Sequence, residues 1–255
     1  MPHAHPTVSL IVVARDEEAL IGQCLRSAWF CDELIVVDSF SADRTVEIAR
    51  GLGARVFQRE WAGYVAQKQF ALEMATSEWV LLLDADEQAT HDLGVEIRSR
   101  LQSPAPSDGY PIRRLLYHLR HYFTRPIYRD SPVRLFRRAR GHIGGRDPHD
   151  KVVVDGTIGP RLEAPILHFS YRDVADHVAT INRFSSVAAA EQEPTAFTPL
   201  KMIANPAWRF VNFYFIRGGF RDGGRGLYAA TAAAFYVFLK YAKLYERRLK
   251  ATRPR

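Results

Sequence analysis

Cysteine is scarce in this chain of 255 residues, which contains only Cys24 and Cys31. Neither belongs to a Cys-x-x-Cys pair or to a histidine-rich cluster, so a zinc site and a disulfide framework find no support. Long apolar runs are missing too, because no uncharged stretch approaches the ~20 residues that span a bilayer. We therefore expect a folded protein of a reducing, cytosolic compartment that does not obviously cross a membrane.

Glycine-rich phosphate loops are also absent. The first expected strand-to-helix turn holds no glycine, which excludes a Gly-x-Gly-x-x-Gly dinucleotide loop there, and no Gly-x-x-x-x-Gly-Lys-Ser/Thr loop occurs in the chain. The N-terminus lacks the cationic start and the long apolar core of a signal peptide. A bound phosphate group must then be held by a metal ion and by basic side chains.

The net charge of +7 comes from one end of the chain. Residues 201–255 contain 12 Lys and Arg against two acidic residues, a local charge of +10, which leaves −3 for residues 1–200. This asymmetry favours contact between the C-terminal part and an anionic surface, either phospholipid or nucleic acid.

Strand and helix patterns alternate through the first hundred residues. Apolar runs at residues 8–14, 33–38, 55–58 and 79–84 predict strands, and helical patterns follow each of them, the last ending at Leu101. The alternation is typical of a parallel sheet built with right-handed crossovers. Residues 103–109 mark a boundary, residues 141–150 are predicted to form a loop, and residues 151–154 a strand.

The fourth strand ends in Asp84, Asp86 and Glu87, three carboxylates within four residues. In open α/β sheets, ligands bind beyond the carboxyl ends of the strands. Carboxylates this close repel one another unless a cation lies between them, and their oxygens suit Mg²⁺ or Mn²⁺, which usually carry phosphate. The pattern predicts a metal and diphosphate site, and an acidic turn that only solvates the strand end is the alternative.

Ten arginines lie between Tyr110 and Arg146, interleaved with aromatic residues that include Tyr128. Arginine forks suit phosphates and sugar hydroxyls, and aromatic faces suit sugar rings or bases. A solvated strand face explains the pattern equally well. Asp150, which directly precedes the strand expected at 151–154, is predicted to lie at the mouth of the same cleft as the three carboxylates.

The expected last helix, from 227 to 248, is amphipathic. At 100° per residue its apolar and its cationic residues fall on two separate arcs, each about 80° wide. The apolar arc contains Phe235, Phe238, Ala242, Tyr245 and Leu249, and the cationic arc contains Lys240, Lys243, Arg247 and Lys250. This arrangement favours a helix lying in a membrane interface, and the alternative is a helix that packs on the core with a solvated basic side.

Several elements together resemble the GT-A glycosyltransferases of family 2. They are residues 8–18, residues 37–45, the Gln67-Lys68 pair and Leu83-Asp-Ala-Asp-Glu87. Residues 133–138, 168–171 and 215–223 look like the lipopolysaccharide-core β-glucosyltransferase subgroup, the WaaE-like proteins. The resemblance, which covers nearly the whole chain, implies an α/β GT-A fold: a mixed, mostly parallel sheet with helices on both faces, plus a helical C-terminal appendage.

The same resemblance implies an organisation and a set of partners. Residues 1–103 would form the nucleotide-sugar-binding half of the GT-A domain, residues 104–198 its acceptor-binding half, and residues 199–255 a basic, aromatic tail that associates with membrane. A nucleotide-sugar donor, a lipid-linked glycan acceptor and an anionic membrane would be the partners, with no nucleic acid. The protein would be cytoplasmic and peripheral on the inner face of the cytoplasmic membrane.

Residue by residue, the resemblance implies a donor pocket. Ala14, Arg15 and Glu17 would line the nucleoside site, and Asp38 would hydrogen-bond the base. Lys68 would lie close to the same pocket.

The reacting groups are assigned in the same way. Asp84 with Asp86 would form the Asp-x-Asp element that meets ribose and the metal-bound diphosphate, with Mg²⁺ or Mn²⁺ as the metal. His168 is a candidate further metal ligand, and a structural histidine is the alternative. Asp150, at a position where the subgroup tends to have glutamate, would accept the proton of the acceptor hydroxyl.

The implied activity is an inverting hexosyltransferase that moves a sugar, with glucose from UDP-glucose as the leading donor, onto a lipid-anchored glycan in lipopolysaccharide-core synthesis. A polyprenyl-phosphate or capsule acceptor is the alternative. The residues themselves also fit two other classes of protein. The sequence around Asp84 also fits a haloacid-dehalogenase phosphatase, although there the motif opens the fold, and the basic tail alone fits a nucleic-acid-binding protein.

Overall fold

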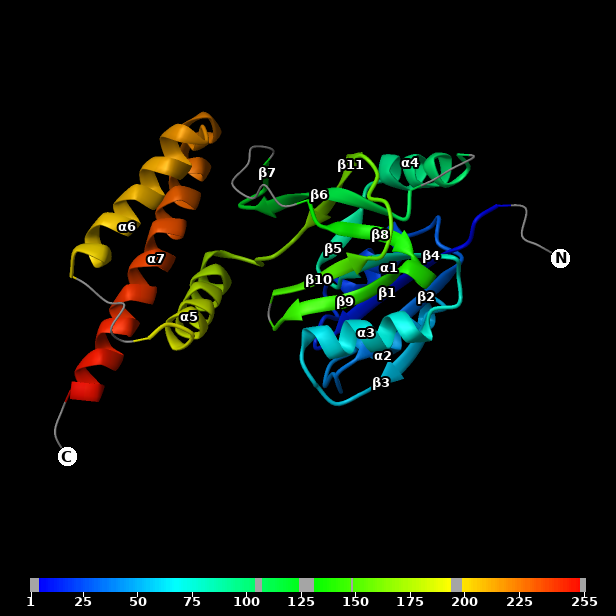
Figure 1. Cartoon of the computed structure of the whole chain (residues 1–255), viewed down its shortest axis with the longest axis horizontal. Coiled ribbons are helices and arrows are strands. Elements are labelled where there is room, and N and C mark those ends of the chain that lie inside the picture. The colour runs from blue at the N-terminus through cyan, green and yellow to red at the C-terminus, as the bar shows by residue number, and fades with distance from the viewer. Residues whose placement is uncertain (1–4, 104–106, 124–130, 148, 194–198, 253–255) are drawn as a thin grey trace. The chain divides into compact units, whose positions relative to one another are not determined.

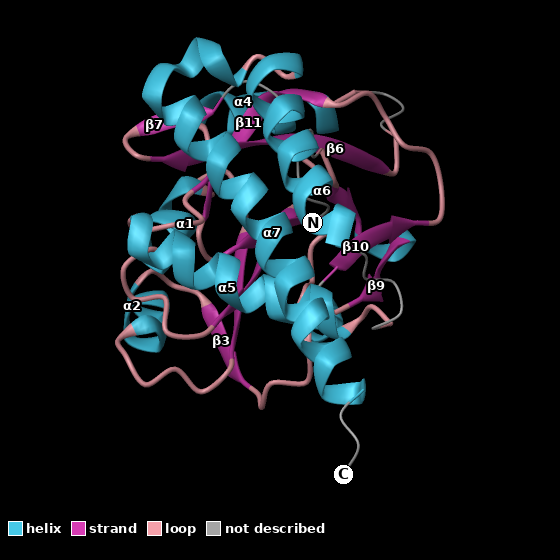
Figure 2. Ribbon diagram, turned by 90° about the vertical axis from the view of Figure 1, so that its left-hand side faces the viewer, coloured by secondary structure: helices cyan, strands magenta, loops and turns pink. Residues whose placement is uncertain are grey.

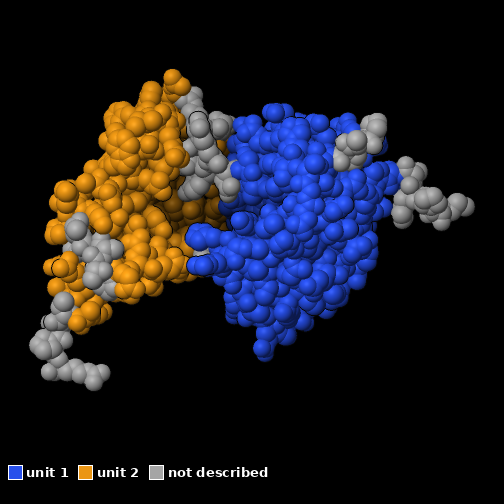
Figure 3. Space-filling model, in the orientation of Figure 1, with its two compact units in different colours: residues 1–115, 129–169 blue, residues 116–128, 170–255 orange. Residues whose placement is uncertain are grey.

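The computed structural model describes residues 5–103, 107–123, 131–147, 149–193 and 199–252. Tyr128 and residues 104–106 of the expected boundary lie outside the described residues. The chain divides into two compact units (Figure 3). Unit 1 consists of Met1–Leu115 and Arg129–Phe169, and unit 2 of Leu116–Tyr128 and Ser170–Arg255.

Four parallel strands form the centre of unit 1, in the order β3-β2-β1-β4 (Figure 1). Their bounds are those expected from the sequence: β1 Val8–Ala14, β2 Glu33–Asp38, β3 Arg55–Gln58 and β4 Trp79–Asp84. The runs of β1, β2 and β4 are mostly apolar because both faces of these strands are covered, whereas β3 is only partly buried. Ala14 pairs with Asp38, and Val13 pairs with Asp84, so the carboxyl ends of β1, β2 and β4 lie at one edge.

The sheet continues beyond β4 with strands of mixed direction. β8 (Val133–Arg137) is antiparallel to β4, and β6 (Gly109–His118) is antiparallel to β8. β11 (Leu162–His168) and β5 (Glu87–Ala89) follow in the order of the sheet and pair antiparallel to each other. This mixed sheet confirms the expected α/β architecture, and β5 places the residues after Asp84 beside the end of β11.

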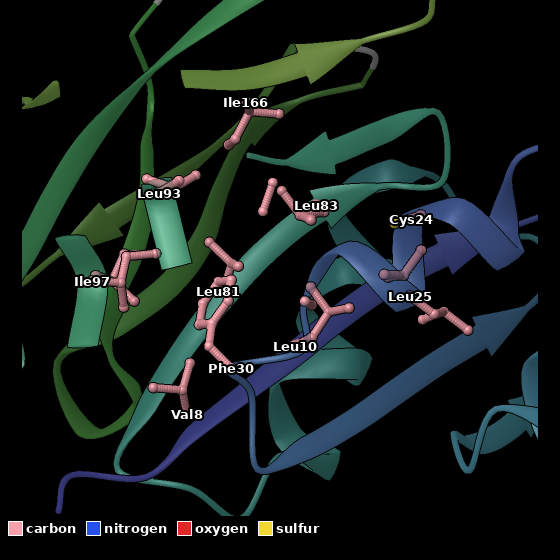
Figure 4. Packing of buried hydrophobic residues seen from close by; sticks show 14 of the residues in the cluster. Val8, Leu10, Cys24, Leu25, Phe30, Leu81, Leu83, Leu93, Ile97 and Ile166 are labelled. Carbon is pink, nitrogen blue, oxygen red and sulfur yellow. The ribbon is translucent and has the colours of Figure 1, made fainter. Parts of the chain in front are cut away.

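Helices cover both faces of the parallel strands. α1 (Ile21–Ser27), α2 (Thr45–Gly51) and α4 (His91–Leu101) pack on the face that includes Leu10 and Leu81 (Figure 4). α3 (Tyr64–Met74) packs on the opposite face, against Ile11 and Ile35. Successive strand residues point to opposite faces, so this two-sided burial is what the uninterrupted apolar runs encode.

The loop expected at 141–150 is wrong, because most of it is a strand. β9 (Gly141–Arg146) pairs antiparallel with β10 (His149–Val154), and Ile143 at its centre is buried among residues of α3 and β10. Three glycines hid the strand pattern. Gly145 has a φ of +99°, and a Cβ there would lie 2.4 Å from the His149 carbonyl oxygen, so the end of this hairpin requires glycine.

Unit 2 is mainly helical. α7 lies between α5 and α6 and packs against both (Figure 1, Figure 2). The helices are α5 Val174–Ala190, α6 Pro199–Val211, the π-helical turn η3 Asn212–Ile216, the 3-10 turn η4 Gly219–Asp222, and α7 Gly223–Thr252. β7 (His121–Phe123) pairs with the last residues of β6.

The helix expected at 227–248 is longer at both ends than the sequence indicated. α7 begins at Gly223 because its first turn packs tightly on η4: a Cβ on Gly226 would lie 1.8 Å from the Gly219 carbonyl oxygen. Glycine at position 226 therefore permits a close contact between two helical segments. Within the described part of the chain, no helix is both long enough and apolar enough to cross a bilayer.

Candidate active site

The edge formed by the carboxyl ends of β1, β2 and β4 carries most of the predicted donor residues. Ala14 and Asp38 are both buried there as a register pair. The Asp38 carboxylate accepts hydrogen bonds from the Ser41 backbone N–H (3.1 Å) and from Gln58 Nε2 (3.2 Å). Asp38 is therefore held rigidly at the strand end by its own loop and by the neighbouring strand.

The turn after β1 carries Arg15 and Glu17. Asp16 takes a positive φ of 54°, and its carboxylate accepts the Ala42 N–H at 2.7 Å, which ties this turn to the loop after β2. Glu17 donates its backbone N–H to Thr45 Oγ1 at 2.7 Å. Arg15 is exposed, with its Nε 3.8 Å from the Asp16 carboxylate, so a ligand at this edge can reach it.

Lys68 joins two of the predicted carboxylates. Its buried ammonium lies 2.7 Å from Asp84 Oδ1 and 2.9 Å from Asp150 Oδ2. Burial lowers the pKa of Lys68, but Asp84 and Asp150 outweigh that effect and the pKa is raised, so the side chain is charged. α3, β4 and the β9–β10 hairpin thus bring together three residues that lie 82 positions apart at most.

Two arginines and Glu87 complete this charge cluster. Arg134 Nη2 donates to Asp84 Oδ2 (3.0 Å) and to Glu87 Oε1 (3.2 Å), and Arg114 Nη1 donates to Glu87 Oε1 (3.1 Å). Glu87 is fully buried, and its other oxygen accepts the Asp84 backbone N–H at 2.9 Å. Burial raises the pKa of Asp84, but Arg134 and Lys68 hold that pKa well below its usual value.

Asp86 lies in the turn between β4 and β5, beside the end of β11. His168 Nε2 is 3.2 Å from Asp86 Oδ2, and the Phe169 backbone N–H donates to the Asp86 carbonyl oxygen at 2.8 Å. Burial lowers the pKa of His168, but the hydrogen bond and the charge of Asp86 outweigh burial, and the pKa is raised. The structure therefore pairs the two residues that were predicted as metal ligands.

Known proteins resemble this chain over nearly its full length. The lipopolysaccharide core biosynthesis glycosyltransferase LpsC of Rhizobium meliloti (strain 1021) is 30% identical over 97% of this chain and 95% of its own. The glycosyl transferase family 2 model matches residues 9–102. The chain belongs to glycosyltransferase family 2. An uncharacterized glycosyltransferase of Rickettsia typhi, RT0209, is 31% identical over 96% of this chain and 88% of its own.

A solved structure also resembles this chain in its fold. The mannosyltransferase PcManGT of Pyrobaculum calidifontis, in complex with GDP-Man and Mn²⁺, superposes with a TM-score of 0.57 at 18% identity and covers 96% of this chain and 89% of its own. The expected GT-A fold is thereby confirmed. Membership of the family leaves no place for the phosphatase alternative or for a protein that only binds nucleic acid.

The Asp86 and His168 side chains could hold a divalent cation if phosphate oxygens of the substrate supply further ligands. The described residues contain no group of three or more His, Cys, Asp or Glu side chains that could hold a metal by themselves. Asp86 and His168 offer one carboxylate and one imidazole side by side. Mg²⁺ and Mn²⁺ sites commonly use one or two protein ligands together with phosphate oxygens and water, so two ligands are enough.

The sequence did not reveal that Arg134 and Arg114 pair with the buried carboxylate of Glu87. Both belong to the arginine-rich stretch that was weighed as a phosphate-reading surface or a solvated face, and the structure pairs both with Glu87 instead. A signal was available, because Glu87 follows an apolar strand and a buried carboxylate requires a cationic partner. Nothing in the sequence indicated which of the ten arginines would supply it.

Proposed function

We propose that this glycosyltransferase is an inverting hexosyltransferase that moves glucose from UDP-glucose to a lipid-anchored glycan in lipopolysaccharide-core synthesis. The single observation that carries the proposal is the cluster of Asp84, Lys68 and Asp150 at the carboxyl edge of the parallel strands, next to the Asp86 and His168 pair. The relative with 30% identity over 97% of the chain, whose name includes lipopolysaccharide core biosynthesis, supports the acceptor class.

In the proposed reaction, one displacement occurs at the anomeric carbon. The acceptor oxygen forms a bond to that carbon while the bond to the diphosphate oxygen breaks, and the hydroxyl proton passes to Asp150. General-base catalysis of this kind contributes about 10²–10⁴-fold. Lys68 holds Asp150 at Oδ2 and fixes the carboxylate in place, and a single displacement converts an α-linked donor into a β-linked product.

The donor would lie across the strand edge. Ala14, Arg15 and Glu17 would line the nucleoside site, Asp38 would accept a hydrogen bond from the base, and Asp84 would meet the ribose. Asp86 and His168 would hold Mg²⁺ or Mn²⁺, which, when bound, neutralises the charge that develops on the leaving diphosphate, an effect of several kcal/mol.

The proposed acceptor class also implies where the enzyme works in the cell. A glycan anchored in lipid presents its hydroxyl at a membrane surface, so the enzyme would work as a peripheral protein on the cytoplasmic face of the cytoplasmic membrane. The local charge of +10 in residues 201–255 supports contact with anionic lipid.

Thermal-shift measurements with UDP-, GDP- and ADP-sugars, each with and without Mn²⁺, test the donor site. We expect UDP-glucose with Mn²⁺ to raise the melting temperature more than either component alone. Asp86→Asn should abolish the Mn²⁺-dependent part of the shift, whereas Asp155→Asn, the same change at an exposed carboxylate outside the site, should leave it intact. A full shift in Asp86→Asn would place the metal elsewhere, and no shift with any sugar nucleotide would refute the proposed donor class.

A further inference from the structure

The apolar side of α6 faces away from the helix on which it packs. Leu200 and Ile203 are each 74% exposed, Trp208 is 61% exposed and Val211 39% exposed. At 100° per residue these four side chains fall within an arc of about 140°. An amphipathic helix in a globular unit normally turns such an arc toward the core, so α6 presents an inverted arrangement.

The side of α6 that contacts α7 is partly polar. Asn205 Nδ2 donates to the Tyr241 hydroxyl at 2.7 Å, and Met202 packs beside the same tyrosine. These contacts fix the rotation of α6 about its own axis. The exposed apolar arc is therefore set by specific packing and does not arise from a loosely attached helix.

The π-helical turn η3 extends the exposed arc. Phe215 is 57% exposed and Ile216 62% exposed, directly after the last residues of α6. We call the resulting surface the α6 face, formed by Leu200, Ile203, Trp208, Val211, Phe215 and Ile216. Large exposed apolar side chains that gather along one helical segment are typical of an interaction surface.

The charges along this segment select the partner. Residues 199–226 contain five cationic residues and one acidic residue, Asp222. The Asp222 carboxylate is only 9% exposed and lies 3.4 Å from His121 Nε2. The cations are Lys201, Arg209, Arg217, Arg221 and Arg225, so the segment that carries the α6 face has a surplus of positive charge.

A second copy of the chain fits this surface poorly. In a two-fold symmetric dimer the same patch would meet itself, which would bring cations against cations. An anionic bilayer offers the opposite charge together with an apolar interior, and tryptophan is enriched where those two regions meet. The chemistry of the α6 face therefore favours phospholipid.

We propose that the α6 face inserts into the boundary between headgroups and acyl chains of an anionic phospholipid bilayer. This inference rests on the proposed function for its biological reason. It narrows the membrane contact expected of residues 199–255 to α6 and η3, whereas the amphipathic pattern favoured the helix now seen as α7. Two cations of the expected α7 arc are engaged inside unit 2: Lys243 donates to Asn182 Oδ1 (2.8 Å), and Arg247 donates to the carbonyl oxygen of Gln192 (2.9 Å).

The test is co-sedimentation of the full chain with vesicles of phosphatidylcholine alone and of phosphatidylcholine with 30% phosphatidylglycerol. The double variant Leu200→Ser with Ile203→Ser removes two of the most exposed apolar side chains. We expect its partition coefficient on the anionic vesicles to fall at least tenfold. The matched control Phe235→Ser with Leu249→Ser, on exposed positions of α7, should change it less than twofold.

Each other outcome overturns the inference. Unchanged binding by the α6 variant, an equal loss in the α7 control, or equal binding to neutral and anionic vesicles would each exclude the α6 face as the anionic-lipid surface. Concentration-dependent dimerisation of the wild type that the α6 variant loses, without vesicle binding, would make a second copy the occupant.

The donor site serves as an independent check. The melting-temperature shift with UDP-glucose and Mn²⁺ should be the same in the α6 variant and the wild type, because both substitutions are in unit 2 and far along the chain from the predicted donor residues. A protein that binds anionic vesicles through α6 but no sugar nucleotide would uphold this inference and refute the proposed function. The two failures are thus distinguishable.

Discussion

At the scale of single residues, the two aspartates of the Asp-x-Asp element lie in different environments. Asp84 contacts both Lys68 and Arg134, so protein cations already neutralise the first aspartate of the Asp-x-Asp element. Asp86 instead faces His168. Two aspartates separated by one residue therefore have different partners: Asp84 pairs with two cations of the charge cluster, and Asp86 pairs with a histidine.

Replacing Asp150 should separate turnover from donor binding. Asp150→Asn keeps the size of the side chain but removes the group that would accept the proton, so we expect the turnover number to fall by about 10²–10⁴-fold. The dissociation constant for UDP-glucose, measured by calorimetry, should change by less than threefold. Full activity in this variant would assign the base to another carboxylate.

Removing Arg134 should destabilise unit 1. Arg134→Met leaves the buried carboxylate of Glu87 with fewer cationic partners, and breaking such a buried pair costs about 3–5 kcal/mol. Urea unfolding measures the free-energy change. Arg140→Met, at an exposed position of the same stretch, should cost less than about 0.5 kcal/mol. Equal values for the two variants would show that the cluster does not stabilise the fold.

At the scale of secondary-structure elements, unit 2 depends on side chains that join α5 to α7. Arg247 donates to carbonyl oxygens at the C-terminal end of α5, where a cation is favourable. His177 of α5 is buried, stacks on Tyr171 with ring centroids 3.9 Å apart, and lies 2.8 Å from the Tyr228 hydroxyl of α7. This histidine links the packing of the helices to pH.

Stability should fall in mildly acidic solution through His177. Burial first, and then the neighbouring His118, lower its pKa to about 4, against about 6.5 in an unfolded chain, while Asp176 acts in the opposite direction. The unfolded state binds more protons in this window, so the contribution is complete above about pH 6.5 and is lost as the pH falls toward 4. The loss amounts to about 2 kcal/mol at pH 5.

Urea unfolding at pH 7.5 and pH 5 measures that loss. His177→Phe keeps an aromatic ring but cannot be protonated, so the difference between the two pH values should shrink by about 2 kcal/mol relative to wild type. The exposed His142→Phe should leave the difference unchanged. An unaltered pH dependence in His177→Phe would exclude this histidine as the sensitive group.

At the scale of the whole molecule, every predicted site residue belongs to unit 1, and the α6 face belongs to unit 2. Hydrogen exchange of the full chain should therefore respond locally to ligand. A donor at 100 times its dissociation constant stabilises the state that binds it by about 2.7 kcal/mol. We expect UDP-glucose with Mn²⁺ to slow exchange in β1, β4 and the β9–β10 hairpin and to leave α6 unchanged. Slower exchange confined to α6 and α7 would contradict the placement of the donor site.

The sequence by itself determined the parallel half of the fold. Strands β1 to β4 have the expected bounds, because β1, β2 and β4 are largely buried on both faces and such strands are mostly apolar, which leaves a local signal, and β3 keeps a short apolar pair between polar ends. It also indicated Asp84, Asp86, Asp150 and Lys68 as candidate residues, through a motif and a family resemblance.

The tertiary structure alone decided which charges meet and which way α6 faces. Lys68 and Asp150 are 82 positions apart, and the choice of Arg134 as the partner of Asp84 depends on the pairing of β8 with β4. The β9 strand was hidden because it contains three glycines, one of which, Gly145, lies at the hairpin end, where a Cβ would clash with the His149 carbonyl oxygen. Periodicity shows that a helix has an apolar side, but only the packing of Asn205 on Tyr241 decides that this side of α6 is left exposed.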